Sequence, residues 1–136
     1  MRVVLDTCVL KLATLPRPDN PAALIVTLGL RGLFEWWASP AILEEYADVL
    51  SAEPTFLEQI HPAVEVCWPL TPLAVIRHEP DNRFVECALA CHADYLVTVN
   101  TARGHFDQSA YGTTRVATPG RFVNLAAVAP LVARLC

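Results

Sequence analysis

The sequence predicts an α/β domain in which helices flank a mostly parallel central β-sheet. Short apolar runs typical of buried strands alternate with stretches of helical periodicity. Asn20-Pro21 and Ser39-Pro40 each place a capping residue before a proline, which is typical of a helix start. The chain has 136 residues, 54% of them hydrophobic and 18% charged, so we expect a single packed domain over residues 1–136.

The predicted strands are short and rich in β-branched or aromatic residues. They cover residues 2–6, 34–39, 95–99 and 114–119. The predicted helices follow cap signals or apolar positions at helical spacing. They cover residues 21–33, 40–50, 55–61 and 80–93, with an extended piece after the third and a last helical region without assigned bounds at the C-terminus.

Charge and hydropathy exclude several classes of protein. The formal net charge of −4 argues against a domain that holds nucleic acid by charge attraction alone. It leaves open an enzyme that meets phosphates through metal ions, because the metal supplies the local positive charge. The longest apolar stretch, residues 21–30, is too short to cross a bilayer, and Asp6 interrupts any N-terminal signal sequence. We therefore expect a cytoplasmic protein that does not contact membranes.

The five cysteines do not show the paired spacing of a zinc site. Cys87 and Cys91 lie four residues apart and are expected to share one helix face, but two ligands do not make a zinc site. Reduced, mostly buried thiols are therefore the expectation.

Acidic residues follow the predicted strands and flank the helices. Asp6 ends the first strand, Glu45 lies on the helix after Ser39, Asp81 begins a later helix, and Asn100 ends the strand 95–99. Ligands of parallel sheets bind at the carboxyl ends of the strands, and carboxylates suit Mg²⁺ or Mn²⁺. Each residue also has a structural alternative: Asp6 as a turn cap, Glu45 on a solvated helix face and Asp81 as a helix N-cap.

The order of these residues resembles that of the PIN domain. The similar segments are "VVLDTCVL", "SPAILEEYADVL", "EPDNRFVECALACHADYLVTVN" and "ARGHF". The resemblance covers residues 2 to about 122, is most specific in its middle segment, and is strongest to the toxin components of bacterial toxin-antitoxin pairs. It implies an endoribonuclease that depends on Mg²⁺ or Mn²⁺ and leaves a 5′-phosphate and a 3′-hydroxyl. It also implies that the protein binds an antitoxin and forms a homodimer.

Matched to the family motif, Asp6, Glu45 and Asp81 are the expected metal ligands, and Asn100 takes the fourth catalytic position. Glu44 is the alternative to Glu45 if the match is displaced by one residue. The remaining candidates are supporting or RNA-steering residues, each with the alternative of an ordinary surface or strand-edge role. They are Thr7, Glu86, Thr98 and His105 as support, and Arg77, Arg83 and Arg103 for RNA.

Three features depart from the family pattern. Cys8 stands where the family usually has Asn, and Val99 stands where Gly is expected. The stretch between Asn100 and His105 is longer than usual by a residue or two. These departures favour an alternative function, a PIN-like binding module with weak or no activity. A phosphatase with Asp6 as nucleophile is disfavoured, because Cys8 occupies the position where a second Asp is expected.

Overall fold

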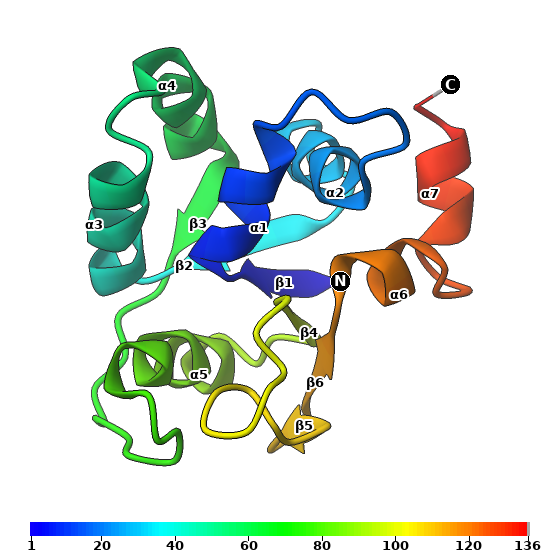
Figure 1. Ribbon diagram of the computed structural model, residues 1–136. Coiled ribbons are helices and arrows are strands. Elements are labelled where there is room, and N and C mark those ends of the chain that lie inside the picture. Colours follow the sequence, from blue (N-terminus) through cyan, green and yellow to red (C-terminus); the bar gives the residue numbers. More distant parts are fainter. Residues whose placement is uncertain (136) are drawn as a thin grey trace.

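A six-stranded sheet lies at the centre of the computed structural model, which describes residues 1–135 (Figure 1). Its strand order is β3-β2-β1-β4-β6-β5, and every neighbouring pair is parallel except β5–β6. The strands are β1 (Arg2–Leu5), β2 (Glu35–Ala38), β3 (Val64–Val66), β4 (Tyr95–Val97), β5 (Ala110–Tyr111) and β6 (Thr114–Ala117). The predicted α/β class with a mostly parallel sheet is confirmed.

Helices cover both faces of this sheet. They are α1 (Thr7–Ala13), α2 (Pro21–Leu30), α3 (Pro40–Val49), α4 (Pro54–Ala63), α5 (Asn82–Ala90), α6 (Pro119–Val123) and α7 (Ala129–Ala133), with a 3-10 turn η1 (Glu79–Asp81). Helix α5 packs on β1, β2 and β4 from one side, while α1 and α2 lie on the other side (Figure 1). Val3, Val4 and Leu5 of the central strand are completely buried, as expected when both faces are covered.

The predicted helix starts are confirmed by their caps. The Asn20 side chain accepts hydrogen bonds from the backbone N–H groups of Ala22 and Ala23, and Ser39 Oγ accepts one from Ile42. Helix α2 ends at Leu30 rather than at Leu33, because the chain turns through Gly32, whose φ of +68° suits glycine.

Other boundaries differ from the sequence predictions. Helix α1 was not expected, since its seven residues are too few to show a clear period. Helix α4 is longer than residues 55–61 and includes Pro62. Strand β4 ends at Val97, and the two-residue strand β5 lies in a stretch read as loop. Within residues 1–135, none of the helices combines the length and apolar character that crossing a membrane requires.

Candidate metal centre

Asp6 lies at the carboxyl end of β1, where the strand passes directly into α1. Its side chain makes no capping hydrogen bond to α1, and the residue is only 4% exposed. Its backbone N–H donates to the carbonyl of Val97 at 3.0 Å, which extends the pairing of β1 with β4 by one step. The turn-cap alternative for Asp6 therefore does not describe its side chain.

Three side chains donate hydrogen bonds to a single oxygen of Asp6, Oδ2. Thr98 Oγ1 lies at 2.7 Å, Cys8 Sγ at 3.3 Å and Asn100 Nδ2 at 3.5 Å. Among the described residues, no side chain donates to the other oxygen, Oδ1. The network fixes the orientation of the carboxylate and leaves one oxygen for a ligand.

Cys8, the first departure from the expected pattern, supports Asp6 through its thiol. Burial and the neighbouring charge of Asp6 raise the pKa of the Cys8 thiol to about 12. The thiol therefore stays protonated at neutral pH and can donate to Asp6. Val99, the second departure, is accommodated without strain, because its φ is not positive.

Glu45 comes from α3 and is held next to Asp6 by two contacts. The Thr7 hydroxyl donates to Glu45 Oε2. The adjacent Tyr46 is buried, and its hydroxyl donates to the carbonyl of Leu5, the residue before Asp6. Glu44, the alternative candidate, points to solvent. The structure therefore places Glu45, not Glu44, beside the first acid.

Asp81 ends the 3-10 turn η1 and is 6% exposed. Like Asp6, it makes no side-chain capping bond to the helix that follows it. Its Oδ2 lies 2.9 Å from His105 Nδ1, so the predicted supporting histidine contacts this acid. The loop of residues 98–105 thus reaches the site despite its unusual length.

The buried side chain of Asn82 positions the segment before Asp81. Its Oδ1 accepts hydrogen bonds from the backbone N–H groups of Val75 and Ile76, and its Nδ2 donates to the carbonyls of Ile76 and Glu79. Sequence reasoning did not assign Asn82, although it stands inside the most specific segment, "EPDN".

His78 is a second residue that sequence reasoning missed. Its ring centroid lies 4.8 Å from that of His105, and the ligand atoms of His78, Asp81 and His105 all lie within 4.8 Å of one another. Its backbone N–H donates to the carbonyl of Gly104 at 2.8 Å, which ties the two loops together. The only available signal was its position three residues before Asp81.

The three acids influence one another electrostatically. Burial raises the pKa of Asp6, the hydrogen bond from Thr98 opposes this, and the charge of Asp81 adds to the increase. Burial likewise raises the pKa of Glu45, against the effect of Thr7 and together with the charges of Asp6 and Asp81. Neither Asp6 nor Glu45 forms an ion pair with Lys or Arg among the described residues. A bound cation would relieve this repulsion.

The donor set fits a hard divalent cation. Three carboxylates supply oxygen ligands, which Mg²⁺ and Mn²⁺ prefer. Within residues 1–135, the acids Asp6, Glu45 and Asp81 do not form a compact group of three ligands, unlike the His78 group. Two ligands of one octahedral Mg²⁺ lie at most about 4.2 Å apart, so in this arrangement at least one of the three carboxylates would meet the ion through a retained water.

Two predicted residues belong to a different network. Glu86 accepts a hydrogen bond from the backbone N–H of Leu73 at 3.0 Å and pairs with Arg83 at 2.9 Å. Arg83 also pairs with Glu79 at 2.8 Å. No hydrogen bond or ion pair connects Glu86 with Asp6, Glu45 or Asp81 in the part of the chain described.

The other two predicted arginines, Arg77 and Arg103, are exposed and form no ion pair within residues 1–135. Arg77 lies against Gly104, the residue before His105. Both arginines therefore belong to the segments that carry His78 and His105.

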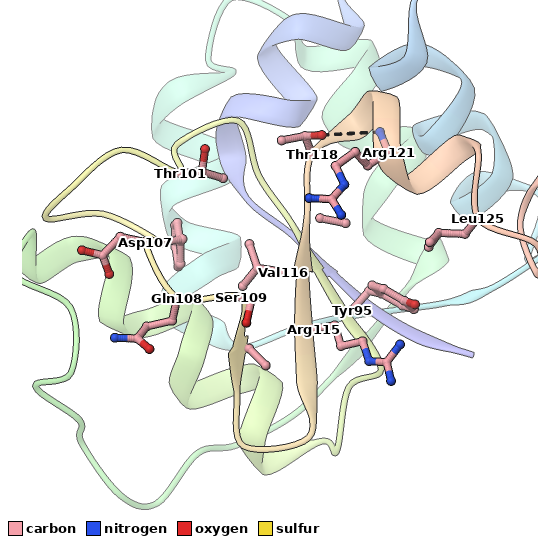
Figure 2. Close-up of a pocket in the computed structure, with 13 residues that line it drawn as sticks. Tyr95, Thr101, Asp107, Gln108, Ser109, Arg115, Val116, Thr118, Arg121 and Leu125 are labelled. Atoms are coloured by element: carbon pink, nitrogen blue, oxygen red, sulfur yellow. Dashed lines mark hydrogen bonds between the residues drawn. The ribbon is translucent and has the colours of Figure 1, made fainter.

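A cavity of about 580 Å³ begins near the carboxyl ends of β4 and β6 (Figure 2). Thr101 and Thr118, which follow β4 and β6, lie at one end of it. Arg115 and Arg121 also line it, and Figure 2 shows the Arg121 side chain extending from α6 toward the cavity. Neither arginine has an ion-pair partner in residues 1–135.

The PIN domain family model matches residues 2–102, well over half of the chain. The chain belongs to the PIN domain family. No curated protein and no solved structure matches this chain significantly. The PIN domain is generally a nuclease fold, and its members typically depend on divalent metals, in keeping with the acids gathered at the carboxyl end of β1.

Proposed function

We propose that this PIN domain is a metal-dependent endoribonuclease, the toxin of a toxin-antitoxin pair, that hydrolyses RNA phosphodiester bonds. One observation carries the proposal. The Asp6 carboxylate is buried beside Glu45 and Asp81, is oriented through one oxygen, and lacks a cationic partner among the described residues. A carboxylate so placed is costly unless something neutralises it. A hard divalent cation does so, and it can also activate water for phosphodiester hydrolysis.

In the proposed mechanism Asp6, Glu45 and Asp81 would hold Mg²⁺ or Mn²⁺, directly or through a retained water. The ion supplies Lewis-acid chemistry, since it lowers the pKa of water and stabilises negative charge on phosphoryl oxygens. Thr98 and Cys8 keep Asp6 in a single orientation, and Thr7 does the same for Glu45. No side-chain nucleophile is required.

His105 is proposed to work through its ring nitrogens. An ionised Asp81 can only accept hydrogen bonds, so His105 Nδ1 holds a proton between them. This leaves Nε2 to receive or deliver a proton at the RNA, next to the exposed ring of His78. With Asp81 holding its ring, His105 would donate a proton to the leaving oxygen when the P–O bond breaks.

The RNA is proposed to approach along two sets of arginines. Arg77 and Arg103 lie in the segments of His78 and His105, and Arg115 and Arg121 line the neighbouring cavity. Phosphate contacts of this kind position a nucleic acid without reading its sequence. Arg83 is the weakest of the predicted steering residues, because Glu79 and Glu86 already compensate its charge.

One observation favours the alternative of a binding module with weak or no activity. At the fourth position Asn100 directs its Nδ2 toward Asp6, so it acts as a hydrogen-bond donor where an Asp would add a charged ligand. RNA binding without cleavage, in the presence of Mg²⁺ and of Mn²⁺, would support this alternative.

The proposed partners rest on different support. Trp68, Leu70 and Val75 are 72%, 94% and 58% exposed, and large exposed apolar side chains favour a protein interface. They support the predicted homodimer, which light scattering on the purified protein would test. The cognate antitoxin stays a prediction.

The deciding experiment is cleavage of a mixed RNA pool by purified protein with Mn²⁺, Mg²⁺ or EDTA. We expect cleavage with either metal only, and a loss of at least about 100-fold in Asp6→Asn, since a metal site supplies several kcal/mol of stabilisation to the transition state. Glu44→Gln is the matched control, because it removes one exposed carboxylate from the same region. Cleavage that survives EDTA, or that survives Asp6→Asn, would refute the proposal.

A further inference from the structure

Three cysteines from two distant segments meet on the α5 side of the sheet. Cys67 follows the edge strand β3, Cys87 lies within α5, and Cys91 ends that helix. They are 7%, 0% and 4% exposed, and their sulfur atoms all lie within 4.8 Å of one another. The proposed nuclease reaction uses none of them.

Cys67 and Cys87 form the closest pair in this cluster. Their sulfur atoms are 2.9 Å apart, whereas the contacts of Cys67 Sγ with the Cys87 carbonyl and of Cys91 Sγ with the Ala88 carbonyl are 3.7 and 3.8 Å. The Cys67 backbone is held to the sheet by its N–H bond to the carbonyl of Ala38. Cys67 thus continues the pairing of β3 with β2 by one step, while Cys87 is fixed within α5.

We propose that Cys67 and Cys87 are a peroxide-oxidisable pair that closes an intramolecular disulfide bond. A thiophilic metal is the less favourable occupant. Three thiolates around Zn²⁺ or Cu⁺ would leave a net negative charge in an apolar interior, and a closed zinc site needs a fourth ligand that the described residues do not offer. A disulfide is neutral.

The reaction balances with one molecule of hydrogen peroxide. The Cys67 thiolate attacks one peroxide oxygen, the O–O bond breaks, and the departing hydroxide takes a proton to become water. The Cys87 sulfur then attacks the resulting sulfenic acid as its own proton leaves. The S–O bond breaks, a second water departs, and the S–S bond remains.

The surroundings favour Cys67 as the attacking sulfur. Hydrogen bonds from the Cys87 and Cys91 thiols lower the pKa of Cys67. The hydrogen bond between Cys87 and Cys67, together with the burial of Cys87, raises the pKa of Cys87. Cys67 is also the most exposed of the three. Trp68 and Ala90, the neighbours of Cys67 and Cys91 in the chain, line a cavity of about 500 Å³.

The bond would close the segment between residues 67 and 87 into a loop, and this segment carries His78 and Asp81. A disulfide that closes such a loop stabilises the fold chiefly by restricting the unfolded chain. It would brace one wall of the proposed nuclease site. Formation of the bond does not depend on nuclease activity, so the two proposals can fail separately.

The test uses reduced protein carrying Cys136→Ser, so that the terminal cysteine cannot compete. After treatment with hydrogen peroxide, free thiols are alkylated, and intact mass and non-reducing peptide maps are recorded. We expect a loss of two hydrogen atoms, about 2 Da, a Cys67–Cys87 linked peptide, and a rise in Tm of roughly 5–10 °C that dithiothreitol reverses.

Matched variants separate this pair from its neighbours. Cys67→Ser and Cys87→Ser should each abolish the bond, whereas Cys8→Ser and the nuclease variant Asp6→Asn should retain it. Cys91→Ala should form the bond more slowly, because Cys67 loses one hydrogen-bond donor. A bond that involves Cys8 or Cys91, a cross-link between chains, or no loss of hydrogen with peroxide would overturn the proposal. Tight binding of one Cd²⁺ ion per chain by the reduced protein, together with no disulfide after peroxide treatment, would also overturn the proposal.

Discussion

Acidic side chains occupy two regions of this protein, and they are compensated in opposite ways. On α5 and the turn before it, Glu79 and Glu86 each pair with Arg83, and Glu86 also accepts a backbone hydrogen bond from Leu73. At the carboxyl end of β1, Asp6 and Glu45 are held only by uncharged donors. The first arrangement shares one cationic side chain, Arg83, whereas in the second neither acid pairs with a Lys or Arg among residues 1–135. Compensation, more than acidity, separates a structural carboxylate from a ligand.

The sharpest test of this comparison is Glu45→Gln set against Glu44→Gln. Glu45 lies beside Asp6, whereas Glu44 points to solvent. We expect RNA cleavage to fall about 100-fold in Glu45→Gln, because a charged ligand is lost, and to change less than about twofold in Glu44→Gln. Equal losses in both variants would show that the helix, not the ligand, matters.

Asn100→Asp should sharpen the difference between the two regions. The change adds a negative charge close to Asp6, which forms no ion pair with Lys or Arg in residues 1–135. We expect roughly tenfold tighter binding of Mn²⁺ in calorimetric titration, and a lower Tm without metal, since like charges repel. If affinity does not increase, residue 100 is not a ligand position.

Glu86→Gln should affect stability and leave activity intact. The variant keeps the shape of the side chain but removes its charge from Arg83 and weakens the bond to Leu73. Hydrogen bonds between charged partners contribute about 1–3 kcal/mol, so we expect a Tm lower by roughly 5 °C. Cleavage per folded molecule should be unchanged, and a large loss of activity would return Glu86 to the site.

The pH dependence of the metal-free protein gives the smallest expected effect. Burial raises the pKa of Asp6 and of Glu45 in the folded state. As pH rises above about 4, the unfolded chain releases these protons first, so their contribution to stability decreases until the folded groups have also ionised. Thermal melts from acidic to neutral pH should show this decrease, and saturating Mn²⁺ or Asp6→Asn should reduce it. If the metal-free wild type and the metal-free Asp6→Asn variant show the same dependence of Tm on pH, the raised pKa of Asp6 is contradicted.

The position of Asp6 was accessible from the sequence. A short apolar strand that runs into a carboxylate predicts an acid at the carboxyl end of a parallel sheet, and the structure places Asp6 there. The helix starts at Asn20 and Ser39 were equally legible, because a cap and a following proline act through neighbouring residues only. The match to the PIN domain motif placed Glu45 and Asp81 in the same region.

Residues whose roles depend on distant partners were not legible in the same way. No role was assigned to Tyr46 from the sequence, yet its hydroxyl donates a hydrogen bond to the carbonyl of Leu5, 41 positions away in the chain. In the sequence, Asp81 and Glu86 are both acids of the same helical segment. Only the folded chain distinguishes them, because it brings Leu73 to Glu86 and His105 to Asp81.

The sequence by itself determined the alternation of strands and helices, the helix starts and the order of the acids, since these follow from interactions between residues close in the chain. Tertiary structure decided which acids are compensated, that His78 lies against His105, and that Cys67 meets Cys87. Those outcomes depend on how the sheet brings the ends of separate segments together. Local sequence patterns do not determine these outcomes, because the pKa and the reactivity of a carboxylate or a thiol depend on neighbours from any part of the chain.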